Sequence, residues 1–317
     1  MTASLDRPPP RGLGRLVPVA VAFGLLVPAP LFAFPLAVLL AFSRPASRGE
    51  VIMASLAGGL SMWWLLQPGN PPDQALRAAL LLSTAAFVLL ARFGALSFTH
   101  RALIAIGVAT AGVTLFFVAF GWSWDQLHWW VISQRTQEGG QALAVLRAGA
   151  RGDSSAALID NLQTVLARSA AFEADNYAAM TGLKLLAGLA LATALYHRVA
   201  TNPRGPALGR FRDFRFTEHL GWAAAIPLVI ILLPDLIRAK VAAANMLLLV
   251  GALYALRGLA VAAFVAGLAG TGPIATALVL MAAFFMLPVV IGGGILLGVL
   301  DAGMDLRRRW KRESSKQ

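Results

Sequence analysis

The sequence contains no cysteine and few charged residues. Without cysteine there is no disulfide framework and no thiolate metal site. Charged residues make up 13% of the 317 residues, whereas soluble domains carry roughly 25%. The four histidines are scattered without metal-ligand spacing, so we expect no metal and no other cofactor; they are His100, His128, His197 and His219.

The sequence also lacks the short motifs of common catalytic sites. It has no phosphate-binding G-x-x-x-x-G-K-[ST] loop, no H-E-x-x-H zinc motif and no G-x-S-x-G nucleophile elbow. Nothing therefore indicates that the chain hydrolyses ATP by itself. No paired acid and base lies within the apolar segments, which makes an intramembrane enzyme acting on lipid a weaker alternative. We expect no enzyme and no catalytic residue.

Apolar residues dominate what remains. They make up 58% of the chain, and the mean hydropathy is +0.71. The stretch 241–300 is almost wholly apolar and several times longer than the ~20 residues that cross a bilayer. The sequence therefore predicts an all-α fold, a polytopic transmembrane helical bundle forming one integral membrane domain over residues 1–317, with the lipid bilayer as its surroundings.

Membrane helices are expected within 16–121 and 179–300. The segments 16–42 and 273–300 are interrupted by proline or glycine, so each is either one long span or a hairpin of two short spans. Hairpins give ten crossings and single spans give eight. Ten crossings place the arginine-rich loop 201–218 and both termini on the cytoplasmic side, as the positive-inside rule favours. We prefer ten spans in a bacterial inner membrane, with eight as the alternative.

The segment 122–178 differs from its surroundings because it mixes charged residues with tryptophans. Its second half predicts an amphipathic helix over 154–172 that lies on the membrane or on the bundle, outside the cell. The expected apolar face comprises Leu158, Leu162, Val165 and Phe172, and the expected water-facing residues are Asp160, Gln163 and Thr164. The tail 301–317 is basic and expected to be cytoplasmic.

The net charge of +12 does not indicate nucleic-acid binding. The arginines and lysines lie mostly at the ends of apolar runs, where they set the orientation of a membrane protein and meet anionic lipid. The loop containing Arg210, Arg212 and Arg215 is either topogenic, which we favour, or a docking site for a cytoplasmic partner.

Arg257 is the residue that its apolar surroundings explain least. A charge within the membrane costs ~2.5 kcal/mol or more and usually faces a cavity or a partner. Tyr254 precedes it by three residues and shares its helix face. The two are candidate ligand-binding residues for an anion. The alternative, which we favour slightly, is a structural charge paired with Asp301, Asp235 or a backbone carbonyl.

Two further features lie close to the C-terminus. Asp301 and Asp305 lie beside three arginines and form either a proton or cation site at the membrane mouth or, as we favour, a salt-bridge cluster at a helix end. The glycine run 292–294 marks either an unwound segment of the kind found in transporters or close helix packing.

Three stretches carry a resemblance to a known family. GRFRDFRFTEHLGW (209–222), NMLLLVGALYALRGLAV (245–261) and LLGVLDAGMDLRRR (296–309) resemble the YybS-like family of uncharacterised bacterial membrane proteins. The resemblance implies a distant similarity to the S components of energy-coupling-factor vitamin transporters, which have six helices and two cytoplasmic ends. Residues 16–199 fit that layout when 16–42 is a hairpin, and the additional C-terminal helices depart from it.

Two functions remain open. The first is a protein that binds or transports a small solute, S-component-like in its first part and energised by partner subunits. The alternative is a non-transporting envelope or growth-associated scaffold that binds other proteins through 122–178 and the basic loops. Transport predicts a polar pocket lined by Arg257 and Tyr254, whereas a scaffold predicts a closed apolar bundle.

Overall fold

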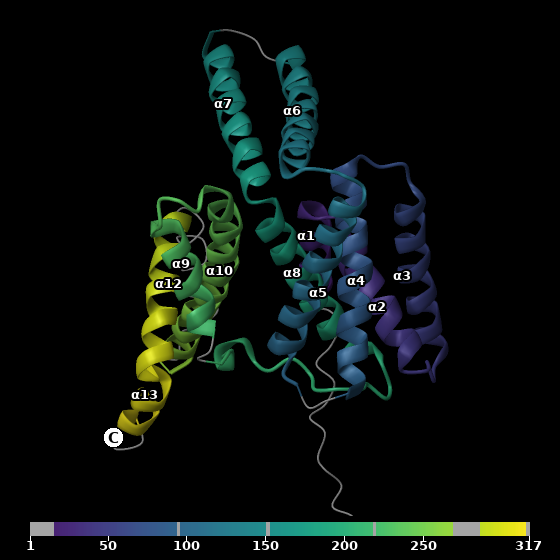
Figure 1. Ribbon diagram of the computed structural model, residues 1–317. Coiled ribbons are helices and arrows are strands. Elements are labelled where there is room, and N and C mark those ends of the chain that lie inside the picture. The colour runs from purple at the N-terminus through teal and green to yellow at the C-terminus, as the bar shows by residue number, and fades with distance from the viewer. Residues whose placement is uncertain (1–15, 94–95, 150–152, 218–219, 269–285, 315–317) are drawn as a thin grey trace, which may run out of the picture. The chain divides into compact units, whose positions relative to one another are not determined.

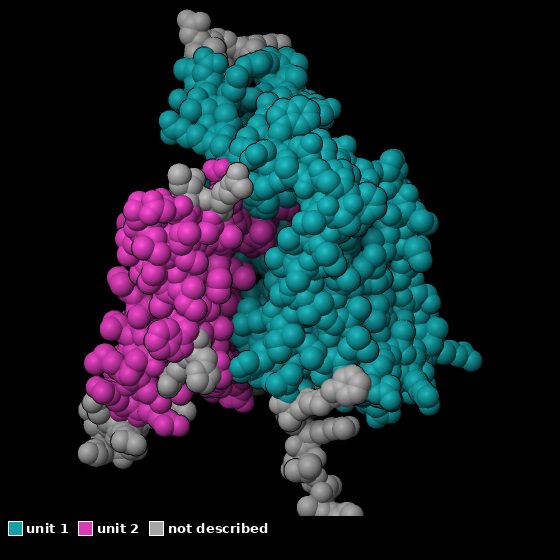
Figure 2. Space-filling model, in the orientation of Figure 1, with its two compact units in different colours: residues 1–174, 181–208 teal, residues 175–180, 209–317 magenta. Residues whose placement is uncertain are grey.

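The structure, a computed structural model, describes residues 16–93, 96–149, 153–217, 220–268 and 286–314 (Figure 1). These residues form helices joined by turns and loops, with no strand among them, which confirms the all-α fold class. The chain forms two compact units (Figure 2). Unit 1 comprises Met1–Ala174 and Thr181–Leu208, and unit 2 comprises Asp175–Met180 and Gly209–Gln317. The basic loop 201–218 thus contains the main boundary between units.

Within the described residues, six helices are long and apolar enough to cross a membrane. This confirms the prediction of a polytopic helical membrane protein. They are α3 (Arg48–Leu66), α4 (Pro71–Phe93), α5 (Phe98–Ala119), α8 (Tyr177–Val199), α10 (Ile237–Leu268) and α12 (Leu287–Met304). Two shorter apolar helices, α2 (Pro30–Phe42) and α9 (Leu220–Leu232), accompany them.

The proline break near the N-terminus separates two short helices, as one of the two sequence alternatives requires. Helix α1 (Val17–Leu26) ends before Val27, whose backbone is extended at φ −141° and ψ 145°, and α2 begins at Pro30. The two helices have 10 and 13 residues, which correspond to lengths of about 15 and 20 Å. Neither length covers a hydrocarbon core of ~30 Å. The first part of the second suspected hairpin, 273–285 of 273–300, lies outside the described residues, so the count of eight or ten spans stays a prediction.

In unit 1 the helix ends are set by local chemistry and the helices pack through apolar side chains. The Ser47 hydroxyl accepts a hydrogen bond from the Glu50 backbone N–H at 3.2 Å and donates to the Glu50 carboxylate at 3.1 Å, which caps the start of α3. Helices α4 and α5 pack through an edge-to-face contact between the Phe87 and Phe98 rings, whose centroids are 5.7 Å apart. The core of unit 1 contains side chains that are at most 1% exposed, including Leu31, Leu40, Leu80, Phe87 and Leu189.

Helices α6 (Trp124–Gly149) and α7 (Asp153–Asp175) form an antiparallel hairpin within unit 1 (Figure 1). Arg135 near the middle of α6 pairs with Glu173 near the end of α7 at 2.8 Å, and Arg147 near the end of α6 donates to Gln163 in the middle of α7 at 2.9 Å. This confirms the predicted helix over 154–172. Neither α6 nor α7 is among the candidate membrane spans found in the described chain.

The side of α7 that packs on the protein differs from the predicted one. The buried positions are Ile159, Ala170 and Ala174, whereas Leu158 and Val165 are each 61% exposed. Phe172 is 51% exposed. These three side chains are largely exposed, so of the two surroundings expected for this face, membrane or bundle, contact with the membrane stays a prediction. On α6, Gly139 lies against Leu166 of α7, because a Cβ added at Gly139 would be 3.4 Å from the Leu166 Cδ1 atom.

Unit 2 contains α9, α10, α12, the short α13 (Leu306–Ser314) and the 3₁₀ turn η2 (Phe211–Asp213). Helices α10 and α12 touch through their backbones: a Cβ added at Gly258 would lie 1.9 Å from the Gly294 carbonyl oxygen, and one added at Gly298 would lie 2.0 Å from that of Tyr254. Small residues permit such close helix packing in membranes. The glycine run 292–294 lies inside the regular helix α12, so the alternative of an unwound segment was wrong.

Candidate functional site

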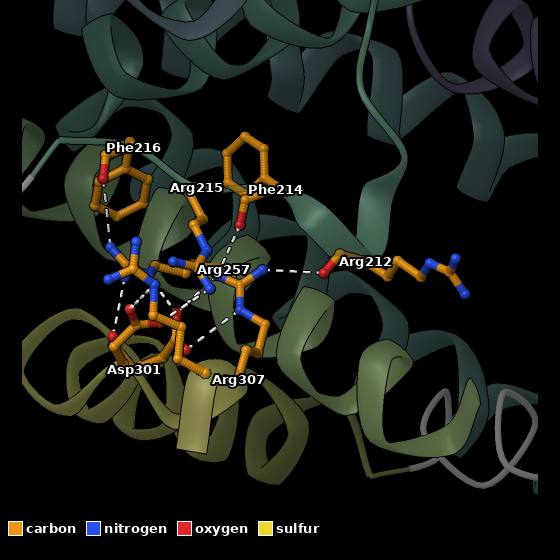
Figure 3. Close-up of polar contacts among 9 residues, drawn as sticks. Arg212, Phe214, Arg215, Phe216, Arg257, Asp301 and Arg307 are labelled. Carbon is orange, nitrogen blue, oxygen red and sulfur yellow. Dashed lines mark hydrogen bonds and ion pairs between the residues drawn. The ribbon is translucent and has the colours of Figure 1, made fainter. Parts of the chain in front are cut away.

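Arg257 lies on α10 and is buried at 4% exposure. Its Nε donates to Asp301 Oδ2 at 2.8 Å and its Nη2 donates to the Asp301 backbone carbonyl at 3.0 Å (Figure 3). Its Nη1 donates to the Phe216 carbonyl at 3.4 Å, and the guanidinium also lies over the Phe216 ring, 5.2 Å from the centroid. Every nitrogen of this guanidinium therefore has an acceptor.

Asp301 holds a second arginine. Its side chain is 0% exposed, and Arg307 Nη2 donates to Oδ2 at 2.7 Å while Arg307 Nε donates to Oδ1 at 3.3 Å. The remaining Arg307 donors reach the loop that precedes α9, with Nη1 on the Arg212 carbonyl at 2.9 Å and Nη2 on the Phe214 carbonyl at 3.0 Å (Figure 3). One carboxylate and several carbonyls thus compensate two buried positive charges, and the cluster ties α10, α12, α13 and the loop together.

The other predicted site residues of unit 2 have separate surroundings. Tyr254 is 7% exposed and packs edge-on against Phe216, with ring centroids 5.1 Å apart. Asp305 ends α12 in the left-handed conformation, and its half-buried carboxylate pairs with Arg215 at 2.9 Å and Arg308 at 3.1 Å. The two aspartates predicted as one cluster at the membrane mouth therefore belong to two ion-pair groups, one fully buried and one at the surface.

This geometry matches the structural alternative for Arg257. The positions that an anion would occupy around its guanidinium are taken by the Asp301 carboxylate and by carbonyl oxygens. Binding of a ligand by Arg257 and Tyr254, and of a proton or cation by Asp301 and Asp305, stay predictions. No group of three or more histidine and acidic side chains suited to a metal ion occurs in the described part of the chain.

Arg101 is a second buried arginine, which the sequence analysis did not single out. It lies in the first turn of α5, is 2% exposed, and its guanidinium lies over the Phe87 ring at 5.0 Å from the centroid. Among the residues that the structure describes, the Arg101 side chain makes no ion pair and no hydrogen bond. Its Nε is buried without an acceptor. Gly205, at φ +79°, lies against it, because an added Cβ there would be 3.2 Å from Arg101 Nη1.

Further positive charge lies at the same end of unit 1. The Arg204 guanidinium lies over the Phe42 ring, 5.4 Å from the centroid, and the Arg204 backbone N–H donates to the Tyr196 hydroxyl at 2.7 Å. Arg198, which ends α8, has a buried Nη1 with no acceptor. His197 of α8 lies close enough to Arg101 for the charge of the guanidinium to act on it.

The buried acid of this end does not compensate the arginines. Glu50 is 2% exposed and accepts from the backbone N–H groups of Ala46 at 3.1 Å and Thr201 at 3.0 Å. The hydroxyls of Ser47 and Thr201 also donate to it. Its carboxylate thus fastens the start of the loop that follows α8. It forms no salt bridge within the described residues, so the Arg101 charge stays without an acid partner.

A bundle with many apolar spans, charged groups at its helix ends and buried ion pairs defines a polytopic helical membrane protein. Residues 16–302 match the family described as predicted membrane protein (DUF2232), and the chain belongs to that family. No curated protein and no solved structure matches the chain. None of these comparisons links it to the S components of transporters.

Proposed function

We propose that this membrane protein binds a small anionic solute, a carboxylate or a phosphate, at Arg101, and that it carries the solute across the bilayer with an energising partner. The observation on which the binding proposal rests is the buried Arg101 guanidinium without an acid partner in the described chain. The sequence has no G-x-x-x-x-G-K-[ST] loop of the kind that binds ATP, and we therefore assign the supply of energy to a partner.

An unpaired buried guanidinium is costly because it cannot lose its proton at any ordinary pH. A buried ion that lacks its partner typically destabilises a protein by several kcal/mol. A carboxylate or phosphate relieves this cost most directly, since both accept two parallel hydrogen bonds from the guanidinium fork. Arg198 and Arg204 at the same end of unit 1 would add to the attraction for an anion.

Arg257 is the weaker candidate for this role because its acceptors are already in place. An anion could bind there only by displacing Asp301, whose carboxylate also holds Arg307. A ligand at Arg101 displaces no such ion pair.

The transport part of the proposal draws on the layout of unit 1. Apart from the α6–α7 hairpin, it contains α1, α2, α3, α4, α5 and most of α8, which is the number of helices that the S-component resemblance implies. This similarity of layout supports a solute-binding subunit that works with partner subunits.

The binding proposal can be tested on the purified protein in detergent. We expect the Tm to rise when inorganic phosphate or a mono- or dicarboxylate is titrated at constant ionic strength. Arg101→Met should abolish the rise, whereas Arg92→Gln, which removes an exposed arginine at the end of α4, should retain it. A rise that persists in Arg101→Met, or no rise with either class of anion in the wild type, would overturn the proposal.

A scaffold role is the second candidate, and the α6–α7 hairpin supports it. The hairpin exposes large apolar side chains, including Trp129 at 64% and Val145 at 75%. Val145→Ser combined with Leu158→Ser should abolish in-cell cross-links to a protein partner if the hairpin is a docking arm, while the anion-dependent rise in Tm is kept. Unchanged cross-links would argue against the scaffold.

A further inference from the structure

Exposed arginines from two elements gather in unit 2 beside the end of a membrane-spanning helix. Helix α12 ends at Met304 and α13 begins at Leu306. Five arginines of this region are exposed, two on α13 and three on the loop before α9; we call them the basic surface, and they are Arg210, Arg212, Arg215, Arg308 and Arg309.

Buried contacts hold the two elements of the basic surface together. Arg307 is 2% exposed, and it donates from α13 to the carbonyls of Arg212 and Phe214 in the loop (Figure 3). Asp305 bridges them a second time, through ion pairs to Arg215 and Arg308. The loop is therefore fixed beside α13. The arginine side chains of the basic surface remain exposed.

The balance of charge on this surface is positive. Asp305 already serves two of the five arginines, and Asp213 is the exposed acid among the described residues of the loop. Arg210, Arg212 and Arg309 have no acid partner within the described residues. The charges stand on two elements and do not converge on one point, which suits a laterally extended anionic surface better than a single small anion.

Two aromatic side chains place the basic surface at the level of lipid headgroups. Phe211 is 49% exposed next to Arg210 and Arg212, and Trp310 is half-buried next to Arg309. Tryptophan and other amphipathic aromatic groups collect at the boundary between hydrocarbon and water. Because α12 is a candidate membrane span that ends at Met304, α13 starts at that boundary.

We infer that the basic surface binds the phosphate headgroups of anionic phospholipids in the leaflet that it faces. Clusters of several arginines next to a membrane helix attract such lipids. The attraction orients unit 2 and fixes α13 against the membrane. This inference does not depend on the anion site at Arg101, which lies in unit 1.

Full-length protein in lipid nanodiscs tests the inference, with phosphatidylglycerol and phosphatidylcholine as competing lipids. Native mass spectrometry should show that phosphatidylglycerol is retained in preference to phosphatidylcholine, and that the preference weakens at high salt. Arg308→Gln with Arg309→Gln should lower the preference by about tenfold. Arg210→Gln with Arg212→Gln should do the same, because both pairs are exposed on one basic surface.

The matched control removes two exposed arginines from unit 1, Arg48→Gln with Arg92→Gln, and should keep the preference. The Tm of every variant in pure phosphatidylcholine should equal that of the wild type, which shows that folding is intact. An equal loss in the control would mean that overall charge, and not this surface, selects the lipid, and would overturn the inference. An unchanged lipid preference with loss of a cross-linked protein partner would assign the surface to a protein and overturn it equally.

Discussion

The two units each bury an arginine, but they treat the charge in opposite ways. In unit 2, the Arg257 guanidinium has a carboxylate at 2.8 Å and carbonyl acceptors for its other nitrogens. In unit 1, the Arg101 guanidinium is equally buried but lies over an aromatic ring, with no acid partner in the described chain. The same kind of side chain therefore closes an ion-pair network in one unit and is buried without an acid partner among the described residues in the other.

The difference separates a charge that belongs to an ion-pair network from a buried charge for which we propose a ligand. Removing one member of a satisfied buried pair exposes the cost of the other member. Removing an unpaired buried charge takes away a cost that the fold already carries. Opposite effects of substitution in the two units would therefore establish the contrast directly.

The largest effect is expected for Asp301→Asn, because one carboxylate compensates both Arg257 and Arg307. We expect the free energy of unfolding to fall by about 3–5 kcal/mol, measured by denaturation in detergent. Asp305→Asn, at the half-exposed ion pair with Arg215, should cost less than about 1 kcal/mol. Equal losses in the free energy of unfolding for the two variants would show that the contribution of Asp301 to stability does not depend on its burial.

Substitution of the two arginines should change stability in opposite directions. Arg101→Met should leave the ligand-free protein unchanged or stabilise it by about 1–4 kcal/mol, because an apolar chain of similar length replaces an unpaired buried cation. Arg257→Met should destabilise it, because Asp301 and the Phe216 carbonyl lose a donor. Tm values measured without added anions provide the comparison. Destabilisation by both substitutions would mean that Arg101 supports the fold and would remove the contrast.

An effect smaller than that of Asp301→Asn is expected in a third ion-pair cluster, in which a partly exposed acid serves two cations. Glu173 of α7 accepts from Arg135 at 2.8 Å and from Lys184 at 2.7 Å. Burial by itself raises the pKa of Glu173, but hydrogen bonds from Arg135 and Lys184 outweigh it and hold the pKa below the usual 4.5. This contribution to stability is therefore complete above pH 4.5 and is lost as the pH falls through the lowered pKa.

We expect Glu173→Gln to weaken the α6–α7 hairpin by about 1–2 kcal/mol at neutral pH. Hydrogen exchange of α6 and α7 should rise in the wild type below the usual carboxyl pKa, and the variant should show this faster exchange at every pH. Glu138→Gln is the matched control, since Glu138 pairs with Arg135 only within α6. A pH dependence that survives in Glu173→Gln would place its origin in another group.

The close contact of α10 and α12 shows which features of this region the sequence pattern could predict and which it could not. The sequence placed Arg257 and Tyr254 on one helix face and named Asp301 as a possible partner, and the structure contains that ion pair. It could not choose between close packing and an unwound segment at the glycine run, because glycine permits both. The backbone contacts of Gly258 and Gly298 depend on how the two helices cross.

The sequence by itself determined the class of the protein, since long apolar segments cannot remain in water and must form helices within a bilayer. It also indicated Pro28 and Pro30 as the place where a helix would kink or break, because proline removes a donor and disfavours helix in the residue before it, but it left one long span and a hairpin of two short spans open. Only the tertiary structure decided which buried arginine is paired, because the partners of Arg257 lie 41 and 44 residues away along the chain. The isolation of Arg101 was likewise invisible in the sequence. Glu50, a buried acid of unit 1, is engaged by the backbone and hydroxyl of Thr201, a contact across 151 residues that no local pattern encodes, and it forms no ion pair with Arg101.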